Sequence, residues 1–225
     1  MRLNDDLTAP VIVHASQMPW TPSPAAGVDR RMLFRIGDEV ARATSIVRYA
    51  PQSVFPRHTH GGGEEILVLD GVFQDEHGDY PAGSYFRNPP GTSHIPASKD
   101  GCTIFVRLWQ FRQDDDDQIV RRPGDGDSLG PRDGAESAIQ LFDDGHENVR
   151  IERGMPGEIG MAENHRGLEA LLIAGSVTIE GQTLPRQSWA RLPAGHSLRA
   201  VAGAEGATVW IKDAPLIHPD VPRLP

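Results

Sequence analysis

Three histidines and one glutamate in the first half of the chain have the residue types and the spacing of metal ligands. His58 and His60 are separated by one residue, Glu64 follows after three glycines, and His94 comes later in a Pro-Pro-Gly loop. Because side chains two apart in a strand point to the same face, the first two imidazoles would lie on one side. Three imidazoles and one carboxylate suit a borderline divalent ion such as zinc, iron, manganese, nickel or copper. The sequence therefore predicts one metal ion bound by these four residues.

Glu65 is an alternative carboxylate for the same site, because it directly follows Glu64. Strand alternation sends neighbouring side chains to opposite faces, so only one of the two can join the histidines. We favour Glu64 as the ligand. Glu65 aligns with Glu169 in the second half of the chain, which predicts a structural role for both.

The segments that must position these residues have the pattern of short strands. The chain holds 24 glycines and 19 prolines, and they bound apolar runs of about four to eight residues. These runs predict strands at Val11–His14, Arg31–Ile36, Ala43–Tyr49, Glu65–Leu69, Gly71–Asp75, Gly83–Asn88 and Thr103–Trp109.

The second half of the chain repeats the first. At an offset of 104 residues, residues 64–91 align with 168–195 without gaps, and Gly71 falls on Gly175. Matched glycines and prolines indicate matched turns, so two copies of one unit are expected. The prediction is an all-β fold with a metal-binding lobe at 1–111, an acidic Gly/Pro-rich linker at 112–136 and a degenerate second lobe with a C-terminal tail at 137–225.

The second lobe lacks the ligand set on this alignment. The positions that match His60, Glu64 and His94 hold Asn164, Leu168 and Leu198. The sequence therefore favours one metal ion per chain. An alignment shifted by one residue keeps open a residual second site on Glu163, His165 and Glu169.

Composition and charge exclude several classes of partner. The formal net charge is −9, and no Lys/Arg run is longer than two residues. Nucleic acids and anionic membranes both require a basic surface, so neither is an expected partner. The chain has a single cysteine, Cys102, and neither a secretory leader pattern nor an apolar run long enough to span a bilayer. These features predict a cytoplasmic protein.

The spacing of the ligands, of Gly71 and of Pro89 resembles the two signature motifs of the cupin superfamily. The first reads His-x-His-x3-Glu-x6-Gly from His58, and the second reads Gly-x5-Pro-x-Gly-x2-His and ends at His94. Gln52 and Ser98 depart from the usual glycine and asparagine of these motifs, and neither is at a ligand position. The resemblance implies two tandem cupin barrels, of the double-stranded β-helix or jelly-roll type.

The stretch from Glu64 to Cys102 more closely resembles the cupin domain of ChrR, an anti-sigma regulator that responds to singlet oxygen and peroxide stress. The resemblance covers about residues 15–110, and a weaker similarity covers residues 137–212. It implies a zinc-like ion on His58, His60, Glu64 and His94. ChrR-type regulators bind their sigma factor through an N-terminal helical zinc domain with an HxxxCxxC motif. This sequence has no CxxC, so we expect the sensor-like module without the sigma-binding module.

The resemblance leaves two main functions. The first is a regulatory or sensor module, which would bind a small or reactive molecule in the barrel cavity and alter the contact with a regulatory protein partner. The second is a metal-dependent dioxygenase that acts on a small oxygenated carbon compound. A third hypothesis is that the metal has a purely structural role. No general base beyond the ligands stands out, so the sequence identifies no catalytic residue, and no organic cofactor is predicted. A homodimer is an expectation from the family.

Overall fold

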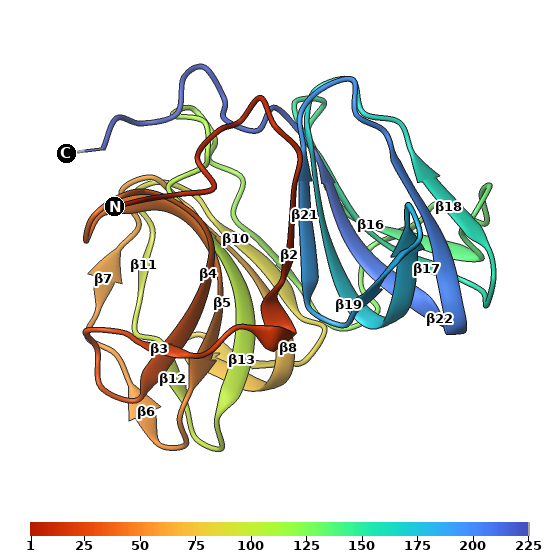
Figure 1. The fold of residues 1–225 in the computed structure, drawn as a ribbon. Coiled ribbons are helices and arrows are strands. Elements are labelled where there is room, and N and C mark those ends of the chain that lie inside the picture. The colour runs from red at the N-terminus through yellow and green to blue at the C-terminus, as the bar shows by residue number, and fades with distance from the viewer. Residues whose placement is uncertain (225) are drawn as a thin grey trace. The chain divides into compact units, whose positions relative to one another are not determined.

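The computed structural model describes residues 1–224, and it confirms the all-β fold. One 3-10 turn, η1 (Ala15–Gln17), accompanies the strands. The chain forms two units (Figure 1). The first comprises Met1–Asp5, Pro19–Gly124 and the chain from Ile217 on, and the second comprises Asp6–Met18 and Asp125–Leu216. No helix among residues 1–224 has the length and apolar character needed to cross a bilayer.

The main sheet of the first unit is antiparallel throughout. Its strands lie in the order β1 (Arg2–Leu3), β4 (Val28–Gly37), β5 (Ala41–Tyr49), β13 (Cys102–Leu108), β8 (Glu64–Asp75), β10 (Tyr85–Asn88) and β14 (Ile119–Arg121). Shorter strands complete the unit, namely β3 (Thr21–Pro22), β6 (Ser53–Val54), β7 (His58–Thr59), β9 (Gly78–Pro81), β11 (Ser93–His94) and β12 (Ala97–Ser98). The strands expected at Arg31–Ile36, Ala43–Tyr49, Glu65–Leu69 and Gly71–Asp75 fall within these elements. The strand expected at Gly83–Asn88 begins only at Tyr85, the one expected at Thr103–Trp109 ends at Leu108, and Val11–His14 is a strand of the second unit.

One face of this sheet carries the core of the first unit. Ile66 and Val68 of β8 lie opposite Val106 and Ile104 of β13, and all four belong to one buried apolar cluster. Phe73 extends the cluster, with its ring 5.5 Å from that of Phe86. Because directly paired residues share a face, the pairing register defines which side chains point to this inner face.

Strand β8 is longer than the sequence suggests. Glu65–Leu69 and Gly71–Asp75 were expected as two strands, and the structure joins them into one bent strand. Gly71 has φ of +70°, and a Cβ there would lie 2.2 Å from the carbonyl oxygen of Gly101. Only glycine fits such a bend, which turns the second half of β8 toward the short strands. The strand then pairs with β9 through the turn at Glu76 and His77, with Asp75 opposite Gly78.

A buried ion pair stabilises the opposite face of β8. Glu65 is 1% exposed, and its carboxylate accepts a 2.6 Å hydrogen bond from Arg107 and another of 2.6 Å from the Tyr85 hydroxyl. Glu169, also buried, accepts a hydrogen bond from the indole of Trp189. Both glutamates therefore have the structural role that the repeat predicted.

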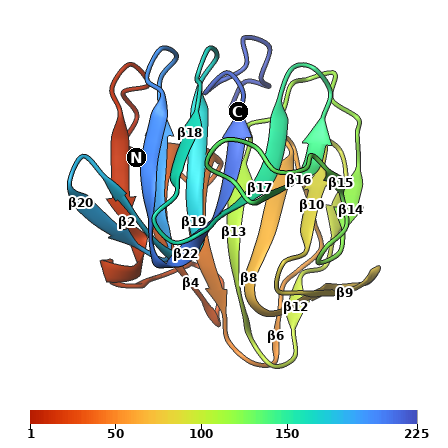
Figure 2. The same cartoon turned by 90° about the vertical axis from the view of Figure 1, so that its right-hand side faces the viewer.

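The second unit is built around another antiparallel sheet. Its strands lie in the order β15 (Asp127–Ser128), β16 (Ser137–Asp143), β17 (Asn148–Gly154), β22 (Leu198–Asp213), β19 (Leu168–Ile179), β21 (Ser188–Leu192) and β2 (Val11–His14). Strands β18 (Ile159–Ala162) and β20 (Gln182–Pro185) pair with β22 and β19. Figure 2 shows the red N-terminal strand β2 running beside the blue strands of this unit.

The expected linker contributes strands to both units. Residues 112–124 belong to the first unit, where β14 pairs with β10. Asp115 lies there beside the guanidinium of Arg87, and both side chains are buried. From Asp125 on, the chain belongs to the second unit, where β15 pairs with β16. The acidic run therefore supplies a partner for a buried arginine and does more than connect two lobes.

Candidate metal centre

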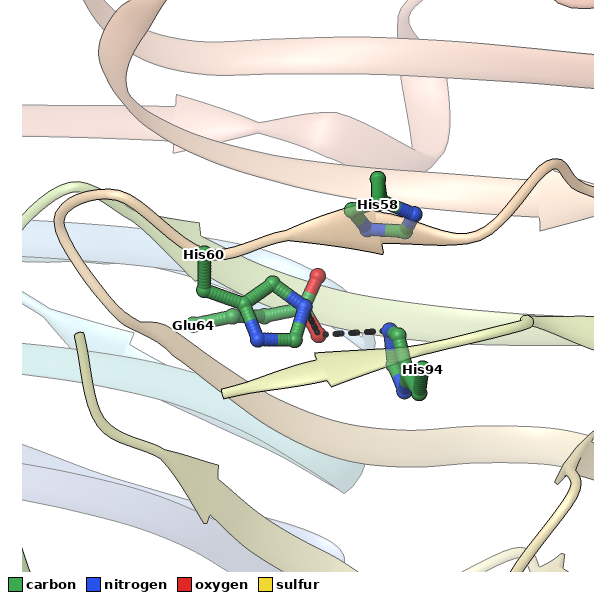
Figure 3. A group of neighbouring side chains, drawn as sticks. All are labelled: His58, His60, Glu64 and His94. Carbon is green, nitrogen blue, oxygen red and sulfur yellow. Dashed lines mark ion pairs between the residues drawn. The ribbon is translucent and has the colours of Figure 1, made fainter. Parts of the chain in front are cut away.

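The four predicted ligands converge in the first unit (Figure 3). His58 and His94 lie directly opposite each other on β7 and β11, His60 follows β7, and Glu64 begins β8. One ligand atom from each side chain lies within 4.8 Å of the corresponding atoms of the others. A single ion contacting all four requires such mutual proximity, so the cluster could hold a metal ion.

The site has a closed side and an open side. His60, Glu64 and His94 are buried, with 5%, 6% and 3% of their surface exposed. His58 is exposed. A metal ion held here would therefore be shielded by the barrel on three sides and reachable from solvent past His58.

The hydrogen bonds of the imidazoles fix which ring nitrogen is free to bind a metal. The Thr92 hydroxyl donates its one hydrogen to the carbonyl of Pro89 at 2.7 Å, so at 2.9 Å it accepts the Nδ1–H of His60. The Nδ1 of His94 faces the Asp75 carboxylate at 3.3 Å. The Nδ1 of His58 faces the carbonyl of Pro56, also at 3.3 Å. Because carboxylates and carbonyls only accept, Nδ1 carries a proton in all three rings, so Nε2 is the ring nitrogen that can bind a metal once it is deprotonated.

The Nε2 atoms of two imidazoles meet at Glu64. The Nε2 atoms of His60 and His94 each lie 3.2 Å from the same carboxylate oxygen, Oε2. Both nitrogens are buried, and neither has a partner in hydrogen-bond geometry among the described residues. Two buried imidazole nitrogens beside a carboxylate need a cation, either a proton on the ring or a metal ion between the rings and the carboxylate. The residues present therefore fit a divalent metal ion.

Two aromatic rings hold the glycine turn between His60 and Glu64. A Cβ on Gly62 would lie 2.2 Å from the ring of Trp109, and one on Gly63 would lie 2.3 Å from the ring of Phe111. The backbone N–H of Trp109 donates to the carbonyl of Gly63 at 3.0 Å. The glycines are thus required by close packing, and the packing sets the position of the ligands at both ends of the turn.

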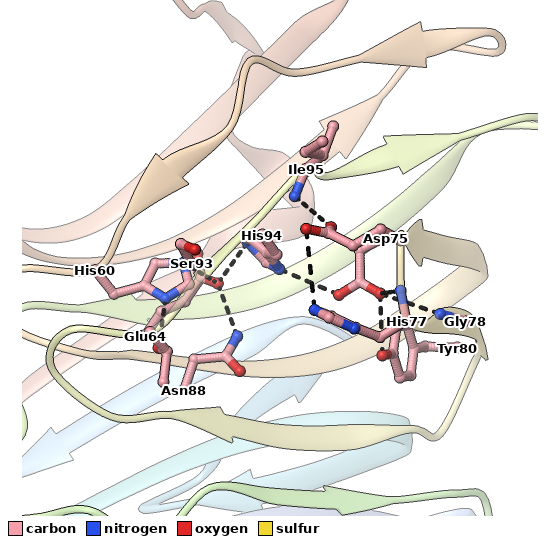
Figure 4. Close-up of polar contacts among 12 residues, drawn as sticks. His60, Glu64, Asp75, His77, Gly78, Tyr80, Asn88, Ser93, His94 and Ile95 are labelled. Atoms are coloured by element: carbon pink, nitrogen blue, oxygen red, sulfur yellow. Dashed lines mark hydrogen bonds and ion pairs between the residues drawn. The ribbon is translucent and has the colours of Figure 1, made fainter.

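Polar residues outside the ligand set orient two of the ligands (Figure 4). Asn88 donates to Oε2 of Glu64 at 3.3 Å. The Oδ2 atom of Asp75 accepts a hydrogen bond from Nδ1 of His94. Its Oδ1 atom accepts hydrogen bonds from the Tyr80 hydroxyl and from the backbone N–H of His77. A carboxylate behind a ligating histidine is a frequent device at metal sites. Sequence reasoning missed Asp75, which is the last residue of the expected strand Gly71–Asp75 and has no local pattern that links it to His94.

Replacing Asp75 by asparagine is expected to weaken metal binding about 10- to 100-fold. The asparagine oxygen would remain with Tyr80 and the backbone, so its NH₂ group would face Nδ1 of His94. Two donors cannot pair, and the imidazole would then carry its proton on Nε2, where the metal must bind. Competition titration with a chelator measures the effect. Asp79→Asn on β9 is the matched control, and an equal loss in both variants would contradict this role.

Metal binding should release a proton over a wide pH range. Burial lowers the pKa of His94, but the Asp75 and Glu64 carboxylates outweigh it and raise that pKa to about 9. Because only neutral imidazole binds a metal, protons compete at every pH below this value. The affinity should therefore rise by about tenfold per pH unit between pH 6 and 8, as for one competing proton. Calorimetry in buffers of different ionisation enthalpy counts the protons, and a flat affinity would refute the expectation.

The residual second site is not assembled. The side chains of Glu163 and His165 are exposed and pair with each other at 3.2 Å, whereas Glu169 is buried beside Trp189. The one group of three or more metal-type side chains found within residues 1–224 is the cluster in the first unit. Asn164, at the position of His60, instead binds the backbone carbonyls of three residues and the N–H of Gly167.

Cys102 lies on β13 among core residues and is 4% exposed. Burial is the main cause that raises the pKa of its thiol to about 11. A buried neutral thiol reacts slowly with oxidants, so this cysteine acts as a small apolar core residue.

Comparison with known proteins agrees with this geometry. Residues 8–112 match the family model of the ChrR cupin-like domain. No curated protein matches the sequence.

Solved structures of cupin-like fold resemble most of the chain. A candidate dioxygenase from Nostoc punctiforme has a TM-score of 0.74 at 16% identity, over 97% of this chain and 87% of that one. A candidate glyoxylate-induced protein from Pseudomonas aeruginosa has a TM-score of 0.71 at 15% identity, over 96% and 92%. The pirin YhhW from Escherichia coli, in complex with nickel(II), has a TM-score of 0.65 at 16% identity, over 92% and 99%. At such identities the likeness establishes the fold alone.

Proposed function

We propose that this chain, whose residues 8–112 match the ChrR cupin-like domain, is a sensor module that binds one zinc ion. The ligands would be His58, His60, Glu64 and His94. The observation that carries the proposal is the arrangement of the three imidazoles, each with its Nδ1 hydrogen-bonded and its Nε2 left for a metal. Three nitrogens and one oxygen complete the tetrahedral set that zinc prefers.

The residues of the site suit a structure that responds to a small molecule. His58 is the one exposed ligand, so an incoming ligand or oxidant would meet this side of the site first. The other three are fixed by polar partners, Thr92, Asn88 and Asp75. A change at His58 could thus alter the site without unfolding the barrel. The bound metal would supply a Lewis-acid centre that attracts anionic or oxygen-rich molecules.

A metal-dependent dioxygenase is the second candidate. The observation that favours it is the solvent-facing side at His58, because a catalytic metal needs access for its substrate. The fold likeness to a candidate dioxygenase is consistent with it. Iron or manganese would keep two of six coordination positions free after binding the same four ligands. The substrate would be a small oxygenated carbon compound.

Metal identity and oxygen consumption separate the two functions. Protein purified without an affinity tag should contain one zinc per chain by elemental analysis and should consume no oxygen. Exposure to peroxide or to a singlet-oxygen generator should then release zinc or change the fluorescence of the chain. Iron or manganese with oxygen uptake on a β-diketone would favour the dioxygenase instead. Absence of stoichiometric metal would overturn both.

The partner and the assembly belong to the same proposal. A sensor acts through a contact with another protein, and the family leads us to expect a regulatory protein partner and a homodimer. Light scattering with and without metal measures whether the chain forms a homodimer. A monomer in both states would remove the dimer from the proposal.

A further inference from the structure

Two arginines point to the inner face of the first unit, where a barrel normally buries apolar side chains. Arg35 pairs with Ala43, Ala43 pairs with Leu108, and Leu108 pairs with Glu64. Paired residues share a face, so Arg35 lies on the same face of the sheet as the metal ligand Glu64. Arg30 pairs in the same way with Val47, which packs against the buried cluster of that face.

Within the part of the chain that the structure describes, neither arginine forms an ion pair with a carboxylate side chain. The Nε of Arg30 is buried and has no hydrogen-bond partner among residues 1–224. Arg35 is 7% exposed and donates to the main-chain oxygen of Asp38. The Asp38 carboxylate is 90% exposed and is bound by the N-terminal amino group. Partly buried guanidinium groups that lack a carboxylate partner are costly, and an anion would lower that cost.

The two guanidinium groups act on each other. Burial lowers the pKa of Arg35, and the charge of Arg30 lowers it further, whereas Asp38 partly opposes this. Two like charges are thus held close together by the strand. Such a pair presents two forks of N–H donors, which match the two oxygens of a carboxylate.

A groove over these arginines can admit a small molecule. It offers about 590 Å³ of open space and is lined by Arg30, Arg35, Met32, Pro24 and Ala25, with the acidic Asp38 and Glu39 also lining it. This size falls in the range of small-molecule sites. Two cations beside apolar side chains favour an anion that carries an apolar body.

We infer that this groove binds a small organic carboxylate, with Arg30 and Arg35 holding the carboxylate group and Met32 contacting the apolar part. The inference does not depend on the metal. It adds a recognition site on the face of the sheet that also carries Glu64. If the proposed sensor function holds, it also gives a chemical class for the molecule that is sensed.

Benzoate, benzyl alcohol and inorganic phosphate are suitable probes, followed by calorimetry or by chemical-shift changes on the full chain treated with EDTA. Benzoate should bind, and benzyl alcohol, which lacks the charge, should not. Arg30→Met and Arg35→Met should each weaken benzoate binding at least tenfold, because methionine keeps much of the stem and removes the charge. Arg153→Met is the control, since Arg153 is 68% exposed and lies in the second unit.

Each alternative result overturns the inference. Equal binding of benzoate in the arginine variants would place the site elsewhere. Equal binding of benzyl alcohol would show an apolar groove without anion recognition, and binding of phosphate alone would exclude a carboxylate site. If metal-loaded protein binds benzoate and Glu64→Leu abolishes this while Arg30→Met does not, the carboxylate coordinates the metal. Circular dichroism of each variant verifies that it is folded, and the metal content is measured separately.

Discussion

Replacement of Glu64 by leucine is expected to abolish stoichiometric metal binding while the barrel remains folded. Loss of a residue that only hydrogen-bonds to a ligand weakens metal binding by up to roughly 100-fold. The affinity should fall further in Glu64→Leu, because this change removes a ligand itself. The second unit shows why the fold should survive. Leu168 occupies the position that matches Glu64 and is fully buried in an apolar cluster with Leu192 and Ile211. Leucine at this strand position is therefore compatible with the surrounding architecture.

Elemental analysis after dialysis measures the metal content, and circular dichroism monitors the fold. Glu163→Gln is the control, because Glu163 is exposed and belongs to the residual site that the shifted alignment allowed. Wild-type metal content in Glu64→Leu together with a loss in Glu163→Gln would place the ion in the second unit. Loss of metal in Glu64→Leu alone supports the assignment in the first.

Replacement of Glu65 by alanine is expected to destabilise the first unit by about 3–5 kcal/mol. The change removes the carboxylate that binds the buried Arg107 and the Tyr85 hydroxyl. The guanidinium is 3% exposed and cannot reach bulk water without rearrangement of β13. Removal of one partner of a buried ion pair is among the most destabilising single changes in a protein.

Urea unfolding followed by far-UV circular dichroism measures this effect. Asp29→Ala is the control, because its ion pair with Arg48 has the same 2.6 Å separation but lies at the surface. Exposed pairs contribute about 0–1 kcal/mol. The double variant Glu65→Leu with Arg107→Leu should be more stable than Glu65→Ala, since it removes both charges. A similar decrease in the free energy of unfolding for Glu65→Ala and Asp29→Ala would disprove the argument.

The cluster of candidate ligands could be predicted because local rules bring its side chains together. Strand alternation places His58 and His60 on one side, and it separates Glu64 from Glu65. The structure agrees on both points, with Glu64 beside the imidazoles and Glu65 on the opposite face. The strands were predictable for the same reason, because Gly and Pro mark their ends.

What the sequence did not reveal depends on distant contacts. Asp75 reaches His94 only because β8 bends at Gly71, and no local pattern shows that bend. The inner-facing Arg35 was hidden by the register shift between Met32 and Phe34, which breaks the alternation along β4. The acidic segment was read as a linker because its composition is polar, and composition cannot show that Asp115 meets Arg87.

The division of the chain into units has a consequence for any attempt to express them separately. The chain crosses from one unit to the other four times, because residues 6–18 and the chain from Ile217 on each belong to the unit built mainly from the opposite half. A gene split after Gly124 would give one polypeptide carrying β2 without its partner β21. It would give another carrying Pro222 without Arg42 and Trp109, which donate to its carbonyl. The two fragments should therefore fold by mutual complementation when coexpressed, and poorly when expressed alone.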